Sequence, residues 1–327
     1  LCTVNFTDFN LNKSQLKALA EEGLETPTLI QERAFSVIMS GKDVVGIAQT
    51  GTGKTLAYLL PILRMWKFRK DPLPQILILV PTRELVEQVV SEIERITTYQ
   101  NVVAVGVYGG VNFKRHQAAV EEGLDVLVGT PGRVFDLLLH GSLKPKAIRH
   151  LVLDEVDELL ALGFRPQLTK IIDVLPPKRQ NLLFSATMTE EVQTVIEDAF
   201  DFPITIEAAP TGTPLENIEQ WVYPVPNYYT KLNLLIHLLA DEETYTRALV
   251  FAPSKRLADV AYETLEPHFG EKVGVIHANK SQNYRFERLR QFDSGEHRIL
   301  IATDLISRGM DISDVSHVIN IDMPDQA

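Results

Sequence analysis

The chain has 327 residues, 45% of them hydrophobic and 23% charged, and its formal net charge is −11. This length and balance favour a folded protein of about two domains. No apolar run reaches the ~18 residues that a membrane-spanning helix needs, and no charged-then-apolar leader opens the chain. Its one cysteine, Cys2, excludes an internal disulfide and a cysteine-based zinc site. We therefore expect a cytoplasmic protein without membrane contact.

A glycine-rich segment lies near the N-terminus. The apolar residues 44–47 lead into Ala48-Gln49-Thr50-Gly51-Thr52-Gly53-Lys54-Thr55, and helix-prone residues follow. Strand, glycine-rich loop and helix in this order are typical of a phosphate-binding loop, whose backbone N–H groups face the phosphates. Lys54 can then reach the β and γ oxygens, and the Thr55 hydroxyl can ligate Mg²⁺. The strict pattern begins with glycine where this chain has Ala48, so a glycine-rich turn that binds nothing is the alternative for this segment alone.

An acidic cluster follows an apolar run later in the first half. His150-Leu151-Val152-Leu153 reads as a buried strand that ends at Asp154-Glu155-Val156-Asp157. Open α/β sheets bind ligands at the carboxyl ends of their strands. Asp154 is then the partner of Mg²⁺, mostly through waters, and Glu155 can orient or deprotonate an attacking water. A solvated helix start is the alternative for the acidic cluster alone. Together with the phosphate loop, the cluster predicts an NTPase.

Strand-like apolar runs alternate with helix-like stretches along the whole chain. This alternation predicts right-handed βαβ units and mostly parallel sheets. Strands are expected at residues 76–80, 102–107, 126–128, 151–153 and 182–184, and then at 221–225, 248–251, 273–276, 299–301 and 318–321. Helices are expected at residues 84–97 and 167–174, among others. Trp66 and Trp221 lie beside apolar runs, which favours core positions for both.

A break in the alternation falls at residues 209–217, which are rich in Pro, Gly and Thr. Such composition without periodicity is typical of a linker. We therefore expect an ATP-binding domain at residues 1–208, a linker at 209–217 and a second domain at 218–327. The second domain repeats the α/β pattern but has no phosphate loop.

Short motifs at wide spacing cover much of the rest of the chain. Besides the two segments above, these are Phe6 with Pro27-Thr28-Leu29-Ile30-Gln31, Pro81-Thr82-Arg83-Glu84-Leu85, Gly109-Gly110, Thr130-Pro131-Gly132-Arg133, Ser185-Ala186-Thr187, Leu249-Val250-Phe251, Gln282-x-x-Arg285, Ala302-Thr303-Asp304 and Arg308-Gly309-x-Asp311. Their identity and order resemble the DEAD-box family of ATP-dependent RNA helicases over essentially the whole chain.

This resemblance implies two tandem RecA-like domains, each a mostly parallel sheet flanked by helices, with ATP and RNA bound between them. It also implies that ATP is bound by Phe6, Gln31, Thr50, Gly51, Thr52, Gly53, Lys54, Thr55, Gly309 and Asp311, and that Mg²⁺ is bound by Thr55 and Asp154. Catalysis falls to Lys54, Asp154 and Glu155, and coupling of the ATP site to RNA falls to Asp157, Ser185 and Thr187. RNA contacts fall to Pro81, Thr82, Arg83, Gly110, Thr130, Pro131, Gly132, Arg133, Arg285, Thr303 and Asp304.

The implied activity is unwinding or remodelling of short RNA duplexes by a monomer whose two lobes close on ATP and single-stranded RNA. Acidic residues outnumber basic ones in both halves, and composition alone therefore favours a metabolic ATPase over a nucleic-acid binder. The resemblance answers this point, because family members grip RNA through backbone amides and a few side chains. Two alternatives stay open: an RNA clamp without productive unwinding, and a DNA translocase on the same core.

Three features depart from the family pattern. Val156 and Ser307 each stand where alanine is usual, and the final arginine-rich motif is absent because the sequence stops at Ala327. We expect the carboxylates around Val156 to keep their places, since a β-branched residue suits a strand end. The missing motif predicts a C-terminally truncated second domain. The chain as printed is then expected to bind ATP, to hydrolyse it negligibly and not to unwind RNA.

Overall fold

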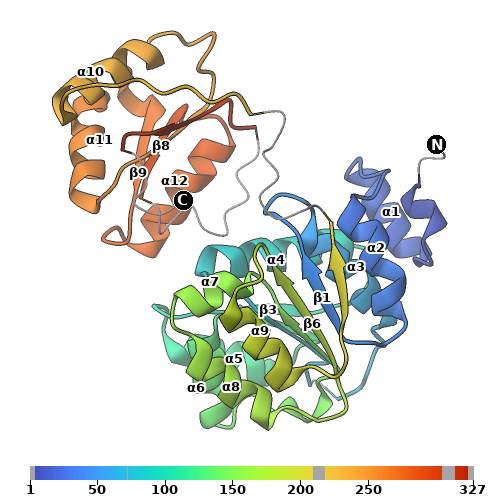
Figure 1. Cartoon of the computed structure of the whole chain (residues 1–327). Helices are drawn as coiled ribbons and strands as arrows, with labels where there is room; N and C mark the ends of the chain where they lie inside the picture. The colour runs from blue at the N-terminus through green and yellow to red at the C-terminus, as the bar shows by residue number, and fades with distance from the viewer. Residues whose placement is uncertain (1–3, 72, 209–217, 304–313, 323–327) are drawn as a thin grey trace. The chain divides into compact units, whose positions relative to one another are not determined.

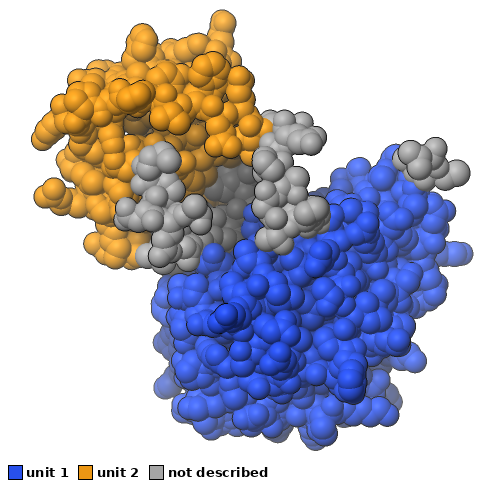
Figure 2. All heavy atoms as spheres, viewed as in Figure 1, with its two compact units in different colours: residues 1–214 blue, residues 215–327 orange. Residues whose placement is uncertain are grey.

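The chain forms two compact units, residues 1–214 and 215–327 (Figure 2). The computed structural model describes residues 4–71, 73–208, 218–303 and 314–322. Each unit is built on a parallel sheet with helices packed against it (Figure 1). The predicted fold class, two α/β domains in tandem, is confirmed. The boundary between the units lies inside the segment predicted as a linker, and that segment itself lies outside the described residues.

Within the described part of unit 1, the sheet has seven parallel strands in the order β3-β4-β2-β5-β6-β1-β7. The strands are β1 (Val44–Ile47), β2 (Ile76–Leu79), β3 (Ala104–Val107), β4 (Val126–Gly129), β5 (His150–Leu153), β6 (Gln180–Ser185) and β7 (Ile204–Glu207). The central strands are continuous apolar runs because both faces of a parallel sheet are covered. Successive residues of β2 alternate between the two core clusters, one on each face of the sheet.

Helices of unit 1 divide between these faces. The elements are η1 (Phe6–Asp8), α1 (Lys13–Glu21), α2 (Leu29–Met39), α3 (Lys54–Met65), α4 (Arg83–Ile96), α5 (Phe113–Glu122), α6 (Pro131–Leu139), η2 (Pro145–Ala147), α7 (Val156–Ala161), α8 (Arg165–Val174) and α9 (Glu190–Ala199). The core cluster on one face contains residues of α1 to α4, and the cluster on the other contains residues of α5 to α9. Because all strands are parallel, their carboxyl ends share one edge, where the loops carrying the predicted motifs emerge.

The described residues of unit 2 form a smaller sheet, with four parallel strands in the order β11-β8-β10-β9. The strands are β8 (Ala248–Phe251), β9 (Val273–Ile276), β10 (Ile299–Ala302) and β11 (His317–Asn320). The helical elements are α10 (Tyr228–Leu239), α11 (Lys255–Phe269), η3 (Gly270–Lys272) and α12 (Gln282–Asp293). A separate core joins α10 and α11 to β8, β9 and β10.

Most expected strands are confirmed to within one or two residues, but one is wrong and one was missed. Residues 221–225 carry neither strand nor helix. Trp221, expected in the core, is 72% exposed, and Val222 is 76% exposed. Strand propensity forms a strand only where a neighbouring strand supplies hydrogen bonds and burial. Strand β7 was missed because its pattern is short and half exposed, yet it pairs along all four residues with β1.

Candidate nucleotide site and nucleic-acid surface

The glycine-rich loop joins β1 to α3 through left-handed backbone that glycine adopts without strain. Gly51 has φ +75°, and Gly53, which precedes the first residue of α3, has φ +82°. A Cβ added at Gly53 would lie 2.4 Å from Nε2 of Gln31, so a side chain there would displace the Gln31 amide. The loop therefore delivers the N-terminus of a 12-residue helix to the carboxyl edge of the sheet, where its N–H groups favour an anion.

Lys54 begins α3 and is buried at 7% exposure. Its Nζ atom has no hydrogen-bond partner among the groups that the structure describes. A buried ammonium without a partner is costly, and proteins keep such a group where a ligand completes it. A triphosphate supplies the charge and the acceptors that this atom lacks, so the loop fits a nucleotide.

Asp154 follows β5 directly and is 2% exposed. Its Oδ1 accepts a hydrogen bond from Glu155 N at 2.9 Å, and its Oδ2 accepts one from the Tyr58 hydroxyl at 2.9 Å. Burial raises the pKa of Asp154 above the usual carboxyl range, and the Lys54 charge acts against that rise. Tyr58 was missed at the sequence level. Its position four residues after Lys54, hence on the same helix face, was the available signal.

Glu155 has an unusual backbone for a residue with a side chain, with φ +49°. Such left-handed conformations cost about 1 kcal/mol or more and concentrate at functional sites. Its Oε2 atom is buried and lacks a hydrogen-bond partner among the described residues. Burial, followed by the neighbouring Asp154 charge, raises the pKa of Glu155 to about 7. A carboxylate titrating near neutral pH is suited to take a proton from water.

Asp157 connects this cluster to the end of β6. Its Oδ2 accepts from Thr187 N at 3.1 Å and from the Thr187 hydroxyl at 2.9 Å. Its backbone N–H donates to the Ser185 hydroxyl at 3.4 Å. The three residues assigned to coupling therefore form one hydrogen-bonded group across neighbouring strand ends.

The residues assigned to adenine recognition have partners within the protein. Gln31 is buried; its Oε1 accepts from Thr28 N at 2.9 Å and its Nε2 donates to Gly53 O at 3.1 Å. The side chain thus ties α2 to the phosphate loop. Phe6 is 3% exposed and packs edge-on against Phe9 with centroids 5.6 Å apart. Its ring belongs to the core of unit 1.

Residues assigned to RNA in unit 1 gather at the carboxyl ends of three adjacent strands, β2, β3 and β4. Thr82 caps the N-terminus of α4, and its hydroxyl accepts from Leu85 N at 3.2 Å. Arg83 lies against the turn after β3, because a Cβ on Gly110 would be 2.4 Å from the Arg83 Nη1 atom. Gly110 also has φ +82°, so the backbone favours glycine there, and a side chain would displace the Arg83 guanidinium. Pro81, Thr130, Pro131 and Gly132 lie at the same edge, at the starts of α4 and α6.

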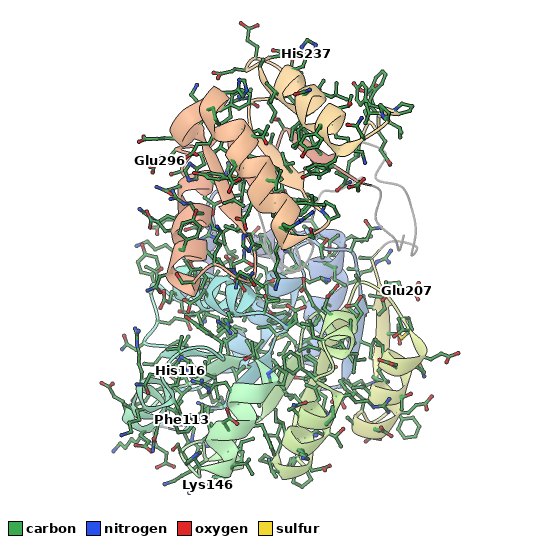
Figure 3. All side chains as sticks on the ribbon, turned by 90° about the vertical axis from the view of Figure 1, so that its left-hand side faces the viewer. Phe113, His116, Lys146, Glu207, His237 and Glu296 are labelled. Carbon is green, nitrogen blue, oxygen red and sulfur yellow. The ribbon has the colours of Figure 1, made fainter. Side chains whose placement is uncertain are left out.

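Arg133 lies at this edge but is only 9% exposed. Its Nη2 donates to Val111 O at 2.9 Å, and its Nη1 lies 2.6 Å from Nδ1 of His116. Burial, and then the charges of Arg133 and Arg115, lower the pKa of His116 to about 4, so the imidazole is neutral and accepts from the guanidinium. His116 and Phe113, both on α5, are labelled in Figure 3, and the Arg133 guanidinium lies 5.7 Å from the Phe113 ring centroid. Arg133 therefore holds α5 and the glycine turn in place.

In unit 2, the described candidates lie at the carboxyl edge of the smaller sheet. Thr303 follows β10 and is buried, and its hydroxyl has no hydrogen-bond partner among the described groups. Arg285 lies half buried in the first turn of α12. His277, at the end of β9, is held by Asp259 at 2.9 Å. Asp304, Gly309 and Asp311 fall outside the described residues.

Comparison with known proteins identifies the family. The DEAD/DEAH box helicase model matches residues 28–195, and the helicase conserved C-terminal domain model matches residues 230–327. The RNA helicase RhlB of Shewanella frigidimarina is 35% identical over 333 residues, which cover 99% of this chain and 76% of that protein. The chain belongs to the DEAD-box helicase family.

Other relatives agree with this assignment. The RNA helicase CrhR of Synechocystis is 36% identical over 327 residues, 99% of this chain. The chain spans 65% of that protein and 42% of DEAD-box ATP-dependent RNA helicase 24 of rice. Among solved structures, Saccharomyces cerevisiae Dbp5 bound to RNA and ADP BeF3 has a TM-score of 0.87 and 28% identity, covering 98% of this chain and 81% of that one. No helix among the described residues is long and apolar enough to cross a membrane.

Proposed function

We propose that the protein is an ATP-dependent RNA helicase that unwinds or remodels short RNA duplexes. The observation that carries this proposal is the pair of buried groups at the phosphate loop, Lys54 Nζ and Glu155 Oε2, that lack a partner among the described residues. One is a cation suited to phosphate, and the other is a carboxylate whose pKa of about 7 suits proton transfer. Family membership and the similarity to Dbp5 bound to RNA support RNA as the second ligand.

Each residue of the site has a role in hydrolysis. Lys54 and the N–H groups at the start of α3 bind the β and γ phosphates. Thr55 and Asp154 would hold Mg²⁺, chiefly through waters, and the ion would neutralise phosphate charge. Glu155 orients the attacking water and accepts its proton at Oε2. The buried setting strengthens each of these electrostatic interactions.

Adenine recognition is proposed for Gln31. Its amide already donates to Gly53 O in the loop and accepts from Thr28 N at the start of α2. To read a base edge it shares or exchanges these bonds. Phe6 supports this region from the core rather than through an open ring face.

RNA is proposed to lie along the carboxyl edge of the unit 1 sheet. Thr82, Arg83 and the backbone at Gly110 supply contacts to phosphate and ribose, which carry little sequence information. Arg133 acts by supporting the turn at Val111. Bound ATP and RNA then draw Arg285 and Thr303 of unit 2, together with Asp304, Gly309 and Asp311, into the same complex, so that strand separation is driven by closure.

Glu155→Gln, made in a version of the protein that carries the arginine-rich motif of the family, tests this proposal. The variant keeps the side-chain shape but cannot accept the proton, so RNA-stimulated hydrolysis is expected to fall roughly 10²–10⁴-fold while ATP still binds. Glu191→Gln, at an exposed position in the first turn of α9, is the matched control and is expected to stay within about two-fold, as surface changes usually do. Hydrolysis by Glu155→Gln at the parental rate contradicts the proposal.

The same assay separates the alternatives. Turnover stimulated by single-stranded RNA but not by matched DNA excludes a DNA translocase. Release of a short labelled RNA strand under the same conditions excludes a clamp that holds RNA without unwinding. Binding of RNA with ATP but no strand release supports the clamp instead.

A further inference from the structure

Tyr58 is a buried polar group beside the nucleotide site to which the motifs assign no role. It lies on α3, one turn after Lys54, and is 0% exposed. Its hydroxyl donates to Oδ2 of Asp154 at 2.9 Å. The other Asp154 oxygen accepts from Glu155 N at 2.9 Å. Both oxygens of this buried carboxylate are therefore satisfied by neutral donors.

Lys54 lies close enough to Asp154 for its charge to oppose the rise that burial causes in the pKa of that carboxyl, yet its ammonium is not hydrogen-bonded within the described part of the chain. In a buried setting an ammonium and a carboxylate attract strongly, so the expected outcome without nucleotide is an ion pair between Lys54 and Asp154. Such a pair would occupy the cation that phosphate needs. The two neutral donors hold the carboxylate in a different arrangement.

The Tyr58 ring is held in position by the ring of Phe184, against which it packs. Its centroid lies 5.3 Å from that of Phe184 on β6. Phe184 in turn fills the space over Gly46 of β1, where an added Cβ would come within 2.5 Å of its ring. A glycine in one strand, a phenylalanine in the next and a tyrosine on the helix thus set where the hydroxyl points. This arrangement is more than an incidental hydrogen bond, because the backing leaves the phenol little freedom.

We propose that Tyr58 is a positioning residue whose hydroxyl holds Asp154 on neutral donors and so keeps the Lys54 ammonium available for nucleotide phosphates. This inference rests on the proposed nucleotide site. It assigns to Tyr58 a role before binding, when Lys54 must not be captured, and a second role in presenting Asp154 to Mg²⁺-bound water. Partners that orient a ligating carboxylate typically contribute 10–100-fold to affinity or activity.

The experiment measures binding of a fluorescent ATP analogue, with EDTA and with Mg²⁺, to the whole protein and to Tyr58→Phe. In EDTA the signal reports on Lys54 without any metal. Tyr58→Phe is expected to weaken binding about 10-fold in EDTA and at least as much with Mg²⁺. In an Asp154→Asn background the carboxylate charge that would capture Lys54 is gone. Adding Tyr58→Phe there is expected to change EDTA binding by less than about two-fold.

Tyr228→Phe is the matched control. Tyr228 is a half-buried tyrosine of unit 2 whose hydroxyl donates to Leu257 O at 2.8 Å. Its loss is expected to lower thermal stability slightly and to leave nucleotide binding unchanged. Phe184→Leu provides a second route, because it keeps the Tyr58 hydroxyl but removes the ring behind it; a smaller loss of binding is expected, again abolished by Asp154→Asn.

The outcomes are distinct. If the parent protein does not bind the analogue, the proposed function fails, and this inference fails with it. If the parent binds and Tyr58→Phe binds equally well, only the role of Tyr58 is overturned. An equal loss with and without Asp154→Asn also overturns it, because Tyr58 would then act through packing alone.

Discussion

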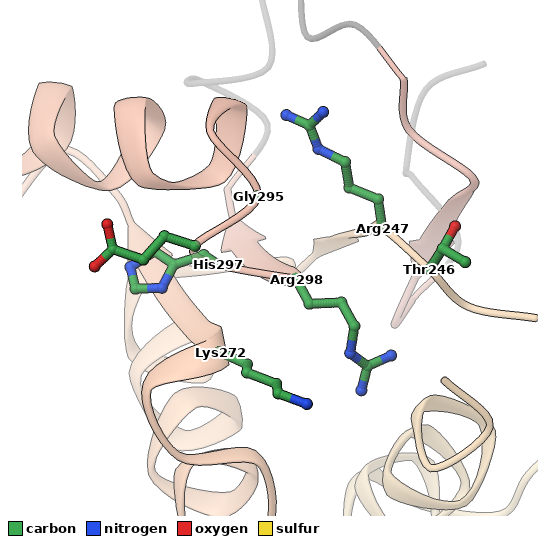
Figure 4. Close-up of a pocket in the computed structure, with 7 residues that line it drawn as sticks. Thr246, Arg247, Lys272, Gly295, His297 and Arg298 are labelled. Atoms are coloured by element: carbon green, nitrogen blue, oxygen red, sulfur yellow. The ribbon is translucent and has the colours of Figure 1, made fainter. Parts of the chain in front are cut away.

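Two clusters of charged residues, one in each unit, differ in whether their charges are paired. The proposed nucleotide site lies at the carboxyl edge of the unit 1 sheet. The second cluster surrounds a hollow of about 220 Å³ in unit 2 (Figure 4). It lies at the opposite edge of its own sheet, because Arg247, Lys272 and Arg298 each immediately precede the first residue of a strand.

The cations around the unit 2 hollow have partners within the protein. Arg298 donates to Tyr245 O at 2.6 Å and to Leu239 O at 2.7 Å. Lys272 contacts both carboxylate oxygens of Glu242, at 2.9 and 3.0 Å. By contrast, the whole charged end of Lys54 at the nucleotide site is unpartnered among the groups described. The number of charges therefore says little about function, whereas the buried charge that the fold leaves unpaired is informative.

The strongest test of this comparison makes one variant in each cluster and measures, for both, the free energy of unfolding and the nucleotide affinity. Lys54→Ala removes a buried cation that the described part of the fold does not compensate, so nucleotide affinity is expected to fall on the order of 100-fold while the free energy of unfolding is unchanged or higher. Arg298→Ala leaves two carbonyls without donors and is expected to destabilise unit 2 by about 3 kcal/mol, with nucleotide binding retained. Denaturant unfolding and equilibrium nucleotide binding measure both quantities.

Lys272→Ala serves as the control for charge alone. Both partners of its ion pair are about half exposed, and exposed pairs contribute little, so neither stability nor binding is expected to change by more than about 1 kcal/mol. The comparison between the clusters breaks down if Lys54→Ala destabilises unit 1 as strongly as Arg298→Ala destabilises unit 2.

A smaller effect is expected at Gln31. This residue is intermediate between Lys54 and the paired cations of unit 2, because its amide is hydrogen-bonded but also faces the proposed nucleotide site. Gln31→Ala is expected to reduce the preference for ATP over GTP by about 1–3 kcal/mol, since base selectivity depends on amide pairing. Competition between the two nucleotides measures this preference. Gln15→Ala is the control: its buried amide donates to Leu60 O at 3.0 Å, and its loss is expected to affect stability only. Selectivity that survives Gln31→Ala argues against adenine recognition by this residue.

The sequence predicts those parts of the molecule that depend on residues close together in the chain. The glycine-rich turn between β1 and α3 could be predicted because its glycines and Lys54 lie within a few residues of one another. The hydrogen bond of Tyr58 could not, since its partner Asp154 is 96 residues away. Burial of Arg133 likewise depends on α5, which meets it only in the folded chain. The strand expected at 221–225 was wrong for the same reason, because pairing depends on a neighbour that propensity does not reveal.

His116 is hydrogen-bonded to Arg133. It tests whether this pair in unit 1 contributes to the free energy of unfolding as the paired cations of unit 2 do. Its folded-state pKa of about 4 is below the unfolded value near 6.5, so the unfolded chain binds more protons between these values. The stability contribution is present above pH 6.5 and is lost as pH falls towards 4, by up to about 3 kcal/mol. Unfolding of the parent and of His116→Asn at pH 7 and pH 4.5 gives the difference. His150, whose pKa is also lowered by burial, contributes equally to both proteins. Parallel pH profiles contradict the expectation.

The smallest expected effect concerns Asp157, a carboxylate at the nucleotide site that is fully paired. Thr187→Val removes the hydroxyl donor at 2.9 Å but leaves the backbone N–H of residue 187 at 3.1 Å. This bond and the one that Glu158 N donates to Asp157 Oδ1 at 3.2 Å keep Asp157 in place at a loss of about 1 kcal/mol, so ATP affinity is expected to hold. If this group transmits the state of the site, RNA stimulation of hydrolysis falls about five-fold, in line with that energy.

Thr194→Val is the matched control, because the half-buried Thr194 donates through its hydroxyl to Glu190 O, one turn earlier in α9. It is expected to leave both affinity and stimulation unchanged. Stimulation that is equal in Thr187→Val and in the parent would mean that a paired charge at the nucleotide site behaves like the paired charges of unit 2, supporting the fold without a part in coupling. A loss of RNA stimulation confined to Thr187→Val would instead show that hydrogen-bonded groups at this edge also take part in coupling. RNA would then change their geometry and not their charge.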